Sequence, residues 1–188
     1  MPITGRSNGG VFCFGDAGFA GSMGGQHLND PVVSLAPGPG GRTYWLVASD
    51  GGVFAFGTAF YGSMGGRYLA EPVLGIDTDP ATGGYWLVAS DGGVFAFNAS
   101  FLGSTGATPP GSPIHSFDAT TSGLGYWLVS SDGGVYSFGD AVNYGGVTGV
   151  PTATPVIGVA VDAATGGYWL VSADGTVSPR NATWFGDF

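Results

Sequence analysis

Two aspartates stand at matching positions in two similar segments of the chain, and their side chains could do chemistry together. Asp77 ends the segment PVLGID and Asp118 ends PIHSFD, whereas the related segments carry Ala36 and Ala160 at this place. Two carboxylates that face each other across a channel could bind a cation or act as the acid and base of a glycoside hydrolase. The composition argues against catalysis, because the chain has a single glutamate, Glu71, no lysine and two histidines.

A second set of polar side chains lies in the loops where the repeated segments differ from one another. The loops GGQHLNDP and GGRYLAEP carry hydrogen-bonding side chains beside aromatic surface, which suits a glycan or a peptide. The predicted ligand-binding residues are Gln26, His27, Asn29, Arg67 and Tyr68. The alternative interpretation is ordinary variation on solvated loops.

Several other classes of site leave no trace in the sequence. There is no nucleophile elbow, zinc-ligand spacing or phosphate-binding loop, because the glycine pairs sit in expected hairpin turns and do not open helices. The formal net charge is −9 with only four arginines, so no basic stripe is available for nucleic acid or an anionic membrane surface. No apolar run is long enough for a membrane span. We therefore expect no enzyme activity, cofactor, metal ion, nucleic-acid partner or membrane insertion.

One aromatic, glycine-rich phrase is repeated along the chain. Trp45, Trp86, Trp127 and Trp169 each lie in a YWLV segment, with a period of about 41 residues. A decayed fifth copy, ITGRSNGGVFCFG, opens the chain and places Asn8 opposite an aspartate of the later copies. The identical placement of the tryptophans predicts that they pack between repeat units and do not stack on sugars.

Each copy of the phrase predicts a β-hairpin. The runs YWLVAS and GVFAFG are joined by Asp-Gly, or by Asn-Gly in the first copy, which favours a type I′ turn with positive φ at both residues. A calcium site at these aspartates is disfavoured because they lie about 40 residues apart, so we interpret them as turn residues that hydrogen-bond their own backbone. They are Asp50, Asp91, Asp132 and Asp174.

Two further strands complete the expected unit, one around FYGS and its equivalents and one in each proline-led segment. Four short antiparallel strands in about 41 residues are typical of a β-propeller blade. We expect an all-β, five-bladed propeller in which the YWLV strand is innermost and the last blade lacks its outer edge. A four-bladed ring with extra terminal strands is the alternative. The single repeat domain, 1–188, would contain blades at approximately 1–38, 43–79, 84–120, 125–162 and 167–188.

The phrase GYWLVASDGGVFAFG, followed by FYGSMGG and PVLGI, resembles the tandem repeat of many predicted secreted or surface proteins of actinobacteria, often joined to peptidases, amidases or esterases. The similarity extends from about Gly9 to Phe188. The resemblance implies a propeller-like fold, an extracellular setting and an accessory or binding role. It supplies no ligand and no catalytic residue, and the C-terminal VSPRNATWFGDF departs from its pattern.

These observations together predict a lectin-like, non-catalytic module for recognition or adhesion outside the cell. Its expected partner is a cell-surface or cell-wall glycan, or a surface protein. One alternative is a structural module that forms homo-oligomers by pairing its terminal strand edges, and another is the glycoside hydrolase described above. Met1 leads directly into repeat-like sequence without a signal peptide. The protein is therefore expected to be either cytoplasmic or, as the resemblance implies, extracellular after removal of a signal.

Overall fold

A computed structural model of the chain describes residues 8–148 and 154–186. This part of the chain folds into short β-strands joined by turns and irregular segments. The strands are β1 (Val32–Pro37), β2 (Tyr44–Ala48), β3 (Val53–Phe56), β4 (Val73–Thr78), β5 (Tyr85–Ala89), β6 (Val94–Phe97), β7 (Ile114–Ala119), β8 (Gly125–Ser130), β9 (Val135–Gly139), β10 (Val156–Asp162), β11 (Gly167–Ser172) and β12 (Val177–Arg180).

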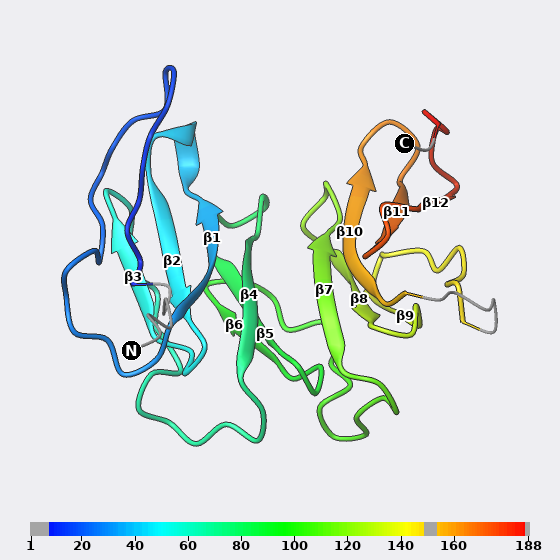
Figure 1. Ribbon diagram of the computed structural model, residues 1–188, viewed down its shortest axis with the longest axis horizontal. Helices are drawn as coiled ribbons and strands as arrows, with labels where there is room; N and C mark the ends of the chain where they lie inside the picture. The colour runs from blue at the N-terminus through cyan, green and yellow to red at the C-terminus, as the bar shows by residue number, and fades with distance from the viewer. Residues whose placement is uncertain (1–7, 149–153, 187–188) are drawn as a thin grey trace.

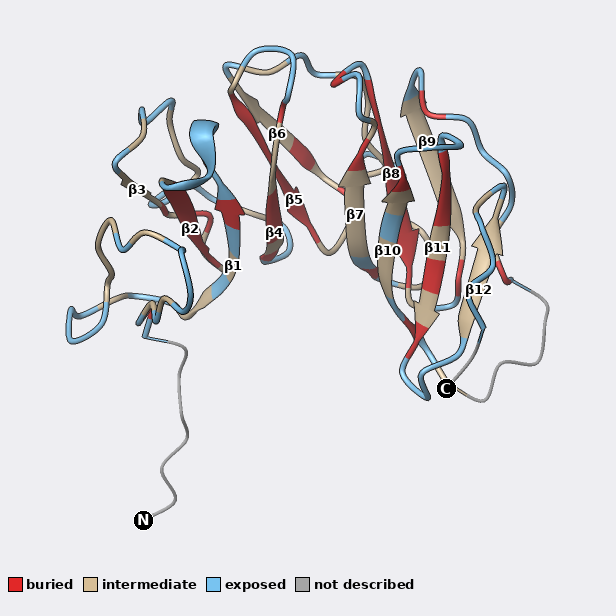
Figure 2. Ribbon diagram, turned by 90° about the horizontal axis from the view of Figure 1, so that it is seen from above, coloured by how far each residue is buried: buried red, intermediate tan, exposed pale blue. Residues whose placement is uncertain are grey.

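The strands form four antiparallel sheets of three strands each. Sheet 1 has the order β1-β2-β3, sheet 2 β4-β5-β6, sheet 3 β7-β8-β9 and sheet 4 β10-β11-β12. The sheets stand side by side in an open, curved row, with sheets 1 and 4 at opposite ends (Figure 1). Strands β1, β4, β7 and β10 lie along the concave side of the row, and β3, β6, β9 and β12 along the convex side (Figure 2). The predicted all-β class is confirmed.

Helical structure within the described residues is limited to one 3₁₀ turn, Pro39–Gly41. None of the helical structure in that part of the chain has the length and apolarity needed to cross a bilayer.

The sheets group the strands differently from the expected repeat units. Each proline-led strand pairs with the YWLV strand that follows it, so YWLV is the central strand of its sheet and the proline-led strand is the inner one. The segments around FYGS, expected as strands, are irregular. Sheet 4 has the same three strands as the others. The copy without assigned strands is the described part of the first one, residues 8–30.

The hairpin turns differ from the prediction in their type and agree with it in the role of the aspartate. In the first sheet the Gly51 N–H donates to the Ala48 carbonyl (2.9 Å), and Gly51 has a φ of +78°. Asp50 does not have a positive φ, whereas a type I′ turn requires one at both of its central residues. The turn is instead a longer loop with a single glycine in the left-handed region, so the predicted type I′ turn is wrong. The Asp50 carboxylate accepts the N–H of Gly52 (2.8 Å), which confirms its turn role. Asn8, Asp91, Asp132 and Asp174 make the same bond in their copies.

The hydrophobic core consists of three layers, one between each pair of neighbouring sheets. The central strands are the most buried parts of the molecule (Figure 2). In each layer a tryptophan of one sheet packs against a tyrosine of the next, and the ring centroids of Trp45 and Tyr85 are 5.1 Å apart. The equivalent pairs are Trp86 with Tyr126 and Trp127 with Tyr168. These three tryptophans are at most 1% exposed, which confirms the predicted packing between units, whereas Trp169 of sheet 4 is half-buried.

The irregular segment after each outer strand is held by the two sheets that it connects. After β3, the indole N–H of Trp45 in sheet 1 donates to the Ala59 carbonyl (2.8 Å). The hydroxyl of Tyr85 in sheet 2 donates to the Gly62 carbonyl (2.7 Å) and accepts the N–H of Tyr61 (3.2 Å). Because the same bonds recur in the next copies, the connecting segments are fixed without belonging to a sheet.

Candidate functional site

A pocket at one rim of the row contains one of the predicted ligand-binding residues, Arg67. It has a volume of about 310 Å³ and lies between the β2–β3 turn and the loop that leads into β4. Arg67 shares this pocket with the carboxylates of Asp30, Asp50 and Glu71. Among the described residues no ion pair holds the exposed Arg67 guanidinium, so its donors are open to solvent. A guanidinium with carboxylates around it offers both donors and acceptors to a polar ligand.

The other predicted ligand-binding residues do not line this pocket. Tyr68 follows Arg67 and is 92% exposed. Gln26, His27 and Asn29 are exposed on the preceding loop of the same rim. Gln26 and Arg67 occupy equivalent positions, because each backbone N–H closes the same turn with the carbonyl three residues earlier, at 2.9 Å in both copies. The structure therefore places these residues on two corresponding loops, and only Arg67 enters the pocket.

The three carboxylates of the pocket were not identified as ligand-binding residues from the sequence. The sequence predicts only a turn role for Asp50, and the structure confirms that role. Asp30 and Glu71 each precede the proline that leads into an inner strand, at equivalent places in two copies, whereas the next copy has Ser112. This acidic residue before proline is the sequence signal for the pocket. The signal does not by itself predict the pocket, because the turn with Asp50 and the proline after Glu71 lie far apart along the chain.

Asp77 and Asp118 lie on the neighbouring inner strands β4 and β7, where each binds the backbone of the following sheet. The N–H of Ala119 in β7 donates to Asp77 Oδ2 (3.0 Å). The N–H of Val161 in β10 donates to Asp118 Oδ2 (2.7 Å). Asp77 also accepts the N–H of Thr78 at its other oxygen (2.7 Å). The two carboxylates therefore connect three successive sheets along the concave side of the row.

The electrostatics of this pair follow from burial and from their closeness. Burial raises the pKa of Asp77 above its usual value, and hydrogen bonds from Thr78 and Ala119 oppose that change. Burial, together with the nearby negative charge of Asp77, raises the pKa of Asp118 from 3.8 to about 6. A proton held by the pair at mildly acidic pH would relieve the repulsion between the two carboxylates.

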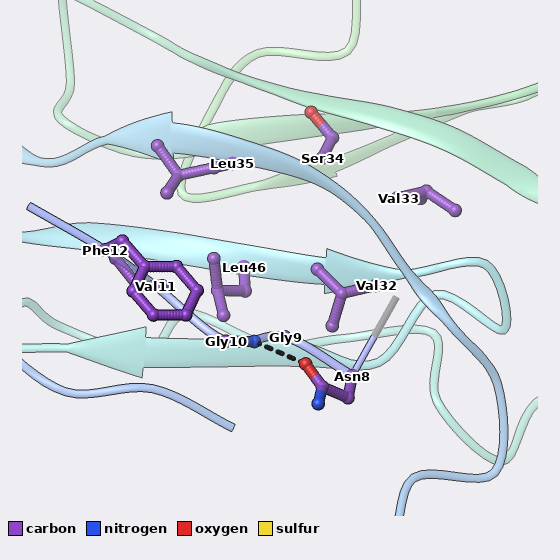
Figure 3. A pocket seen from close by; sticks show the side chains of 10 residues that line it. All are labelled: Asn8, Gly9, Gly10, Val11, Phe12, Val32, Val33, Ser34, Leu35 and Leu46. Carbon is purple, nitrogen blue, oxygen red and sulfur yellow. Dashed lines mark hydrogen bonds between the residues drawn. The ribbon is translucent and has the colours of Figure 1, made fainter. Parts of the chain in front are cut away.

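A pocket of about 550 Å³, with polar and apolar surface in nearly equal parts, lies at the exposed face of sheet 1 (Figure 3). One wall is β1, with Val33 and Leu35, and the other is the N-terminal segment with Phe12. Val33 is 42% exposed and Leu35 48%, whereas Ile76, the equivalent of Leu35 in sheet 2, is 5% exposed. In sheet 2 this face is covered by the preceding sheet. The pocket thus marks the face of sheet 1 that has no complete sheet before it among the described residues.

Two smaller clefts open at the other rim, between sheets 1 and 2 and between sheets 3 and 4. Trp45 lines the first cleft with Asp79, in about 320 Å³, and Trp127 lines the second with Asp140, in about 220 Å³. Both tryptophans are at most 1% exposed. They therefore present no open aromatic face on which a sugar ring could stack.

The described residues contain no group of three or more His, Cys, Asp or Glu side chains that could hold a metal ion. The chain matches no protein-family model and has no significant match among the curated proteins.

Proposed function

We propose that the protein is a non-catalytic recognition or adhesion module that acts outside the cell or at its surface and binds a cell-surface or cell-wall glycan. The observation that carries this proposal is the Arg67 pocket, which this guanidinium lines together with three carboxylates without forming an ion pair among the described residues. Sugar hydroxyls both donate and accept hydrogen bonds, so they match such a mixture of groups. Hydrogen bonds to charged groups are the stronger kind, which favours a specific contact.

A non-catalytic role is supported by what Asp77 and Asp118 already do. Each carboxylate accepts a backbone N–H of the next sheet. An acid and base pair of a glycoside hydrolase needs carboxyl groups that are open to substrate and water. The structural bonds of this pair compete with that use.

The architecture that we propose for this module is five units of the β-propeller type, which form an open row in the single chain. The four sheets supply four of them, and the copy at residues 8–30 supplies the fifth in incomplete form. Its support is the bonding of residues 20–21 to sheet 1. The N–H groups of Ala20 and Gly21 donate to the Tyr44 hydroxyl, which in turn donates to the Gly21 carbonyl. The later connecting segments are bonded to their tyrosines in a similar way. Propellers serve many unrelated functions, so the ligand class rests on the pocket and not on the fold.

The experiment is a screen of the purified chain against glycans and peptidoglycan fragments, followed by titration of the hits with Arg67→Gln. Glutamine is the residue that this chain carries at the equivalent position 26, so the loop should fold normally. Loss of charged hydrogen bonds should weaken binding by roughly 10- to 100-fold. Arg42→Gln, at an exposed arginine outside the pocket, is the matched control and should leave affinity unchanged. Absence of saturable glycan binding, or equal affinity of the Arg67→Gln chain, would contradict the proposal.

A further inference from the structure

The contact between successive units includes a phenylalanine ring seated on a glycine. A Cβ atom placed on Gly62, in the segment after sheet 1, would collide with the Phe97 ring of sheet 2 at 2.6 Å. Gly21 and Gly103 meet Phe56 and Phe138 in the same way. The glycine is required here because only a residue without a side chain lets the ring lie on the backbone. Three successive contacts therefore share this pairing of ring and glycine. Between sheets 3 and 4 Arg180 stands at the phenylalanine position, and a Cβ atom on Gly145 would meet no atom within 4 Å.

The two ends of the row carry the unmatched halves of this contact. Phe14, the equivalent of Phe56 in the N-terminal copy, is 84% exposed. Gly186, the equivalent of Gly21 after sheet 4, is exposed and would have no atom within 4 Å of an added Cβ. Within residues 8–148 and 154–186, one end thus presents a ring without its glycine, and the other presents a glycine without its ring.

The apolar surfaces around these two residues are also exposed, whereas their equivalents inside the molecule are covered. Phe95 and Phe97 of sheet 2 pack against the core cluster that Trp45 of sheet 1 forms with residues of both sheets. In the N-terminal copy the equivalent of Phe95 is Phe12, which is also 84% exposed. In sheet 4 the equivalent of Trp45 is Trp169, which is only half-buried. The apolar surface needed by each end is therefore the surface that the opposite end exposes.

The polar bond between sheets is absent from the open face of sheet 4. Where Asp77 and Asp118 bind the next sheet, β10 has Ala160, and this alanine is exposed. At the equivalent position of sheet 1, Ala36 is covered by sheet 2 and is 1% exposed. Covering the open face would therefore bury no unpaired carboxylate, which is the costly outcome at apolar interfaces.

We propose that a second copy of this chain covers these surfaces, end to end, with Phe12 and Phe14 of one copy packed on Trp169 and Gly186 of the other. The argument is continuity with the interfaces inside the molecule, since the docked ends would repeat a contact that the chain already makes between its own units. The contact is heterologous, because two different surfaces meet. Such contacts form closed rings or open filaments. This surface is separate from the Arg67 pocket and does not depend on the proposed function.

The test uses two variants that each remove one half of the contact, Phe14→Ser and Gly186→Val. Sedimentation velocity of the unmodified chain should show a mass that rises above the monomer with concentration. Each variant alone should stay monomeric at the same concentrations. An equimolar mixture should form a heterodimer that does not grow further, because the intact Phe14 end of one variant fits the intact Gly186 end of the other. Phe101→Ser, at a phenylalanine 61% exposed on a connecting segment, is the matched control and should assemble normally.

Three results would overturn the proposal. The first is an unmodified chain that remains monomeric at every concentration, including a monomer whose ends close on each other. The second is assembly that persists in both variants, because other surfaces would then be responsible. The third is a mixture of the variants that contains only monomers although the unmodified chain assembles. Circular dichroism of each variant ensures that the fold is intact, and both substituted positions are exposed.

Discussion

At the scale of single residues, the carboxylates of Asp77 and Asp118 act as connections between sheets. Inner strands of neighbouring sheets are not paired with each other, so their N–H groups need other acceptors. Asp77 and Asp118 supply two of these acceptors, and the Ser116 hydroxyl supplies a third by accepting the N–H of Val159 (3.1 Å). The arrangement satisfies the backbone but brings two acidic groups together in a half-buried place.

Asp118→Asn should stabilise the fold at neutral pH. The pKa of Asp118 is raised from 3.8 to about 6. The protonated Asp118 carboxyl therefore stabilises the folded state fully below pH 3.8, and this stabilisation is lost as the pH rises through about 6. An asparagine oxygen can still accept the N–H of Val161, and the repulsion with Asp77 disappears. The free energy of unfolding at pH 7 should rise by about 1–3 kcal/mol, with no gain near pH 4. Urea unfolding from pH 4 to 8 measures the difference.

The matched control for this substitution is Asp16→Asn, at an exposed aspartate. It should leave the profile between pH 4 and 8 unchanged. A variant Asp118→Asn that is less stable than the unmodified chain at pH 7 would show that the charge itself strengthens the bond to Val161.

The sequence predicted this pair only in part. The sequence places Asp77 and Asp118 at matching positions of two repeats, and these positions lie on the neighbouring inner strands β4 and β7. Their bonds to Ala119 and Val161 could not be predicted, because those bonds depend on how far one sheet is rotated against the next. The same applies to the Arg67 pocket, whose carboxylates come from a turn and from two loops that only the packing of sheets 1 and 2 brings together.

At the scale of elements, the repeated tyrosine connects each sheet to the segment that precedes it. The Tyr85 side chain is buried, and its hydroxyl satisfies both the Gly62 carbonyl and the Tyr61 N–H. The sequence predicted the YWLV run as a strand and its tryptophan as a residue that packs between units. It did not reveal that the tyrosine hydroxyl holds an irregular segment, because that segment has no strand pattern of its own.

Tyr85→Phe should destabilise the protein while keeping the aromatic packing. The ring still contacts Trp45 and Phe97, but two backbone groups lose their partner. Unsatisfied buried groups cost about 1–3 kcal/mol, which should appear as a lower midpoint in thermal or urea unfolding. Tyr68→Phe, at a tyrosine 92% exposed, provides the comparison and should have no effect. Equal stability of both variants would mean that water replaces the Tyr85 hydroxyl.

At the scale of the whole molecule, the open row makes the sheets unequal. Sheets 2 and 3 are covered on both faces by neighbouring sheets, whereas in the described part of the chain sheet 4 has a neighbouring sheet on one face only (Figure 2). In repeat proteins the stability of a unit depends on its own strands and on each interface that it shares. An end unit with one interface is therefore less stable than a central one.

Hydrogen exchange should reveal this inequality along the chain. In dilute samples of Phe14→Ser, whose ends are expected to stay free, amides of β11 and β12 should exchange faster than those of β5 and β8. The reason is that local opening of sheet 4 exposes one interface, while opening of sheet 2 or 3 exposes two. Mass spectrometry of peptides from each strand gives the comparison. Equal protection across these strands would contradict an additive, unit-by-unit stability.

The double attachment of each connecting segment also bears on how such a chain can change in length. The segment after β3 is held by Trp45 of the sheet that it leaves and by Tyr85 of the sheet that it enters. A gene duplication or deletion of one full period, wherever its breakpoints fall, adds or removes one tryptophan and one tyrosine together. Every remaining segment then keeps both attachments. Recombination between copies can thus lengthen or shorten the row by whole units without creating a new kind of interface.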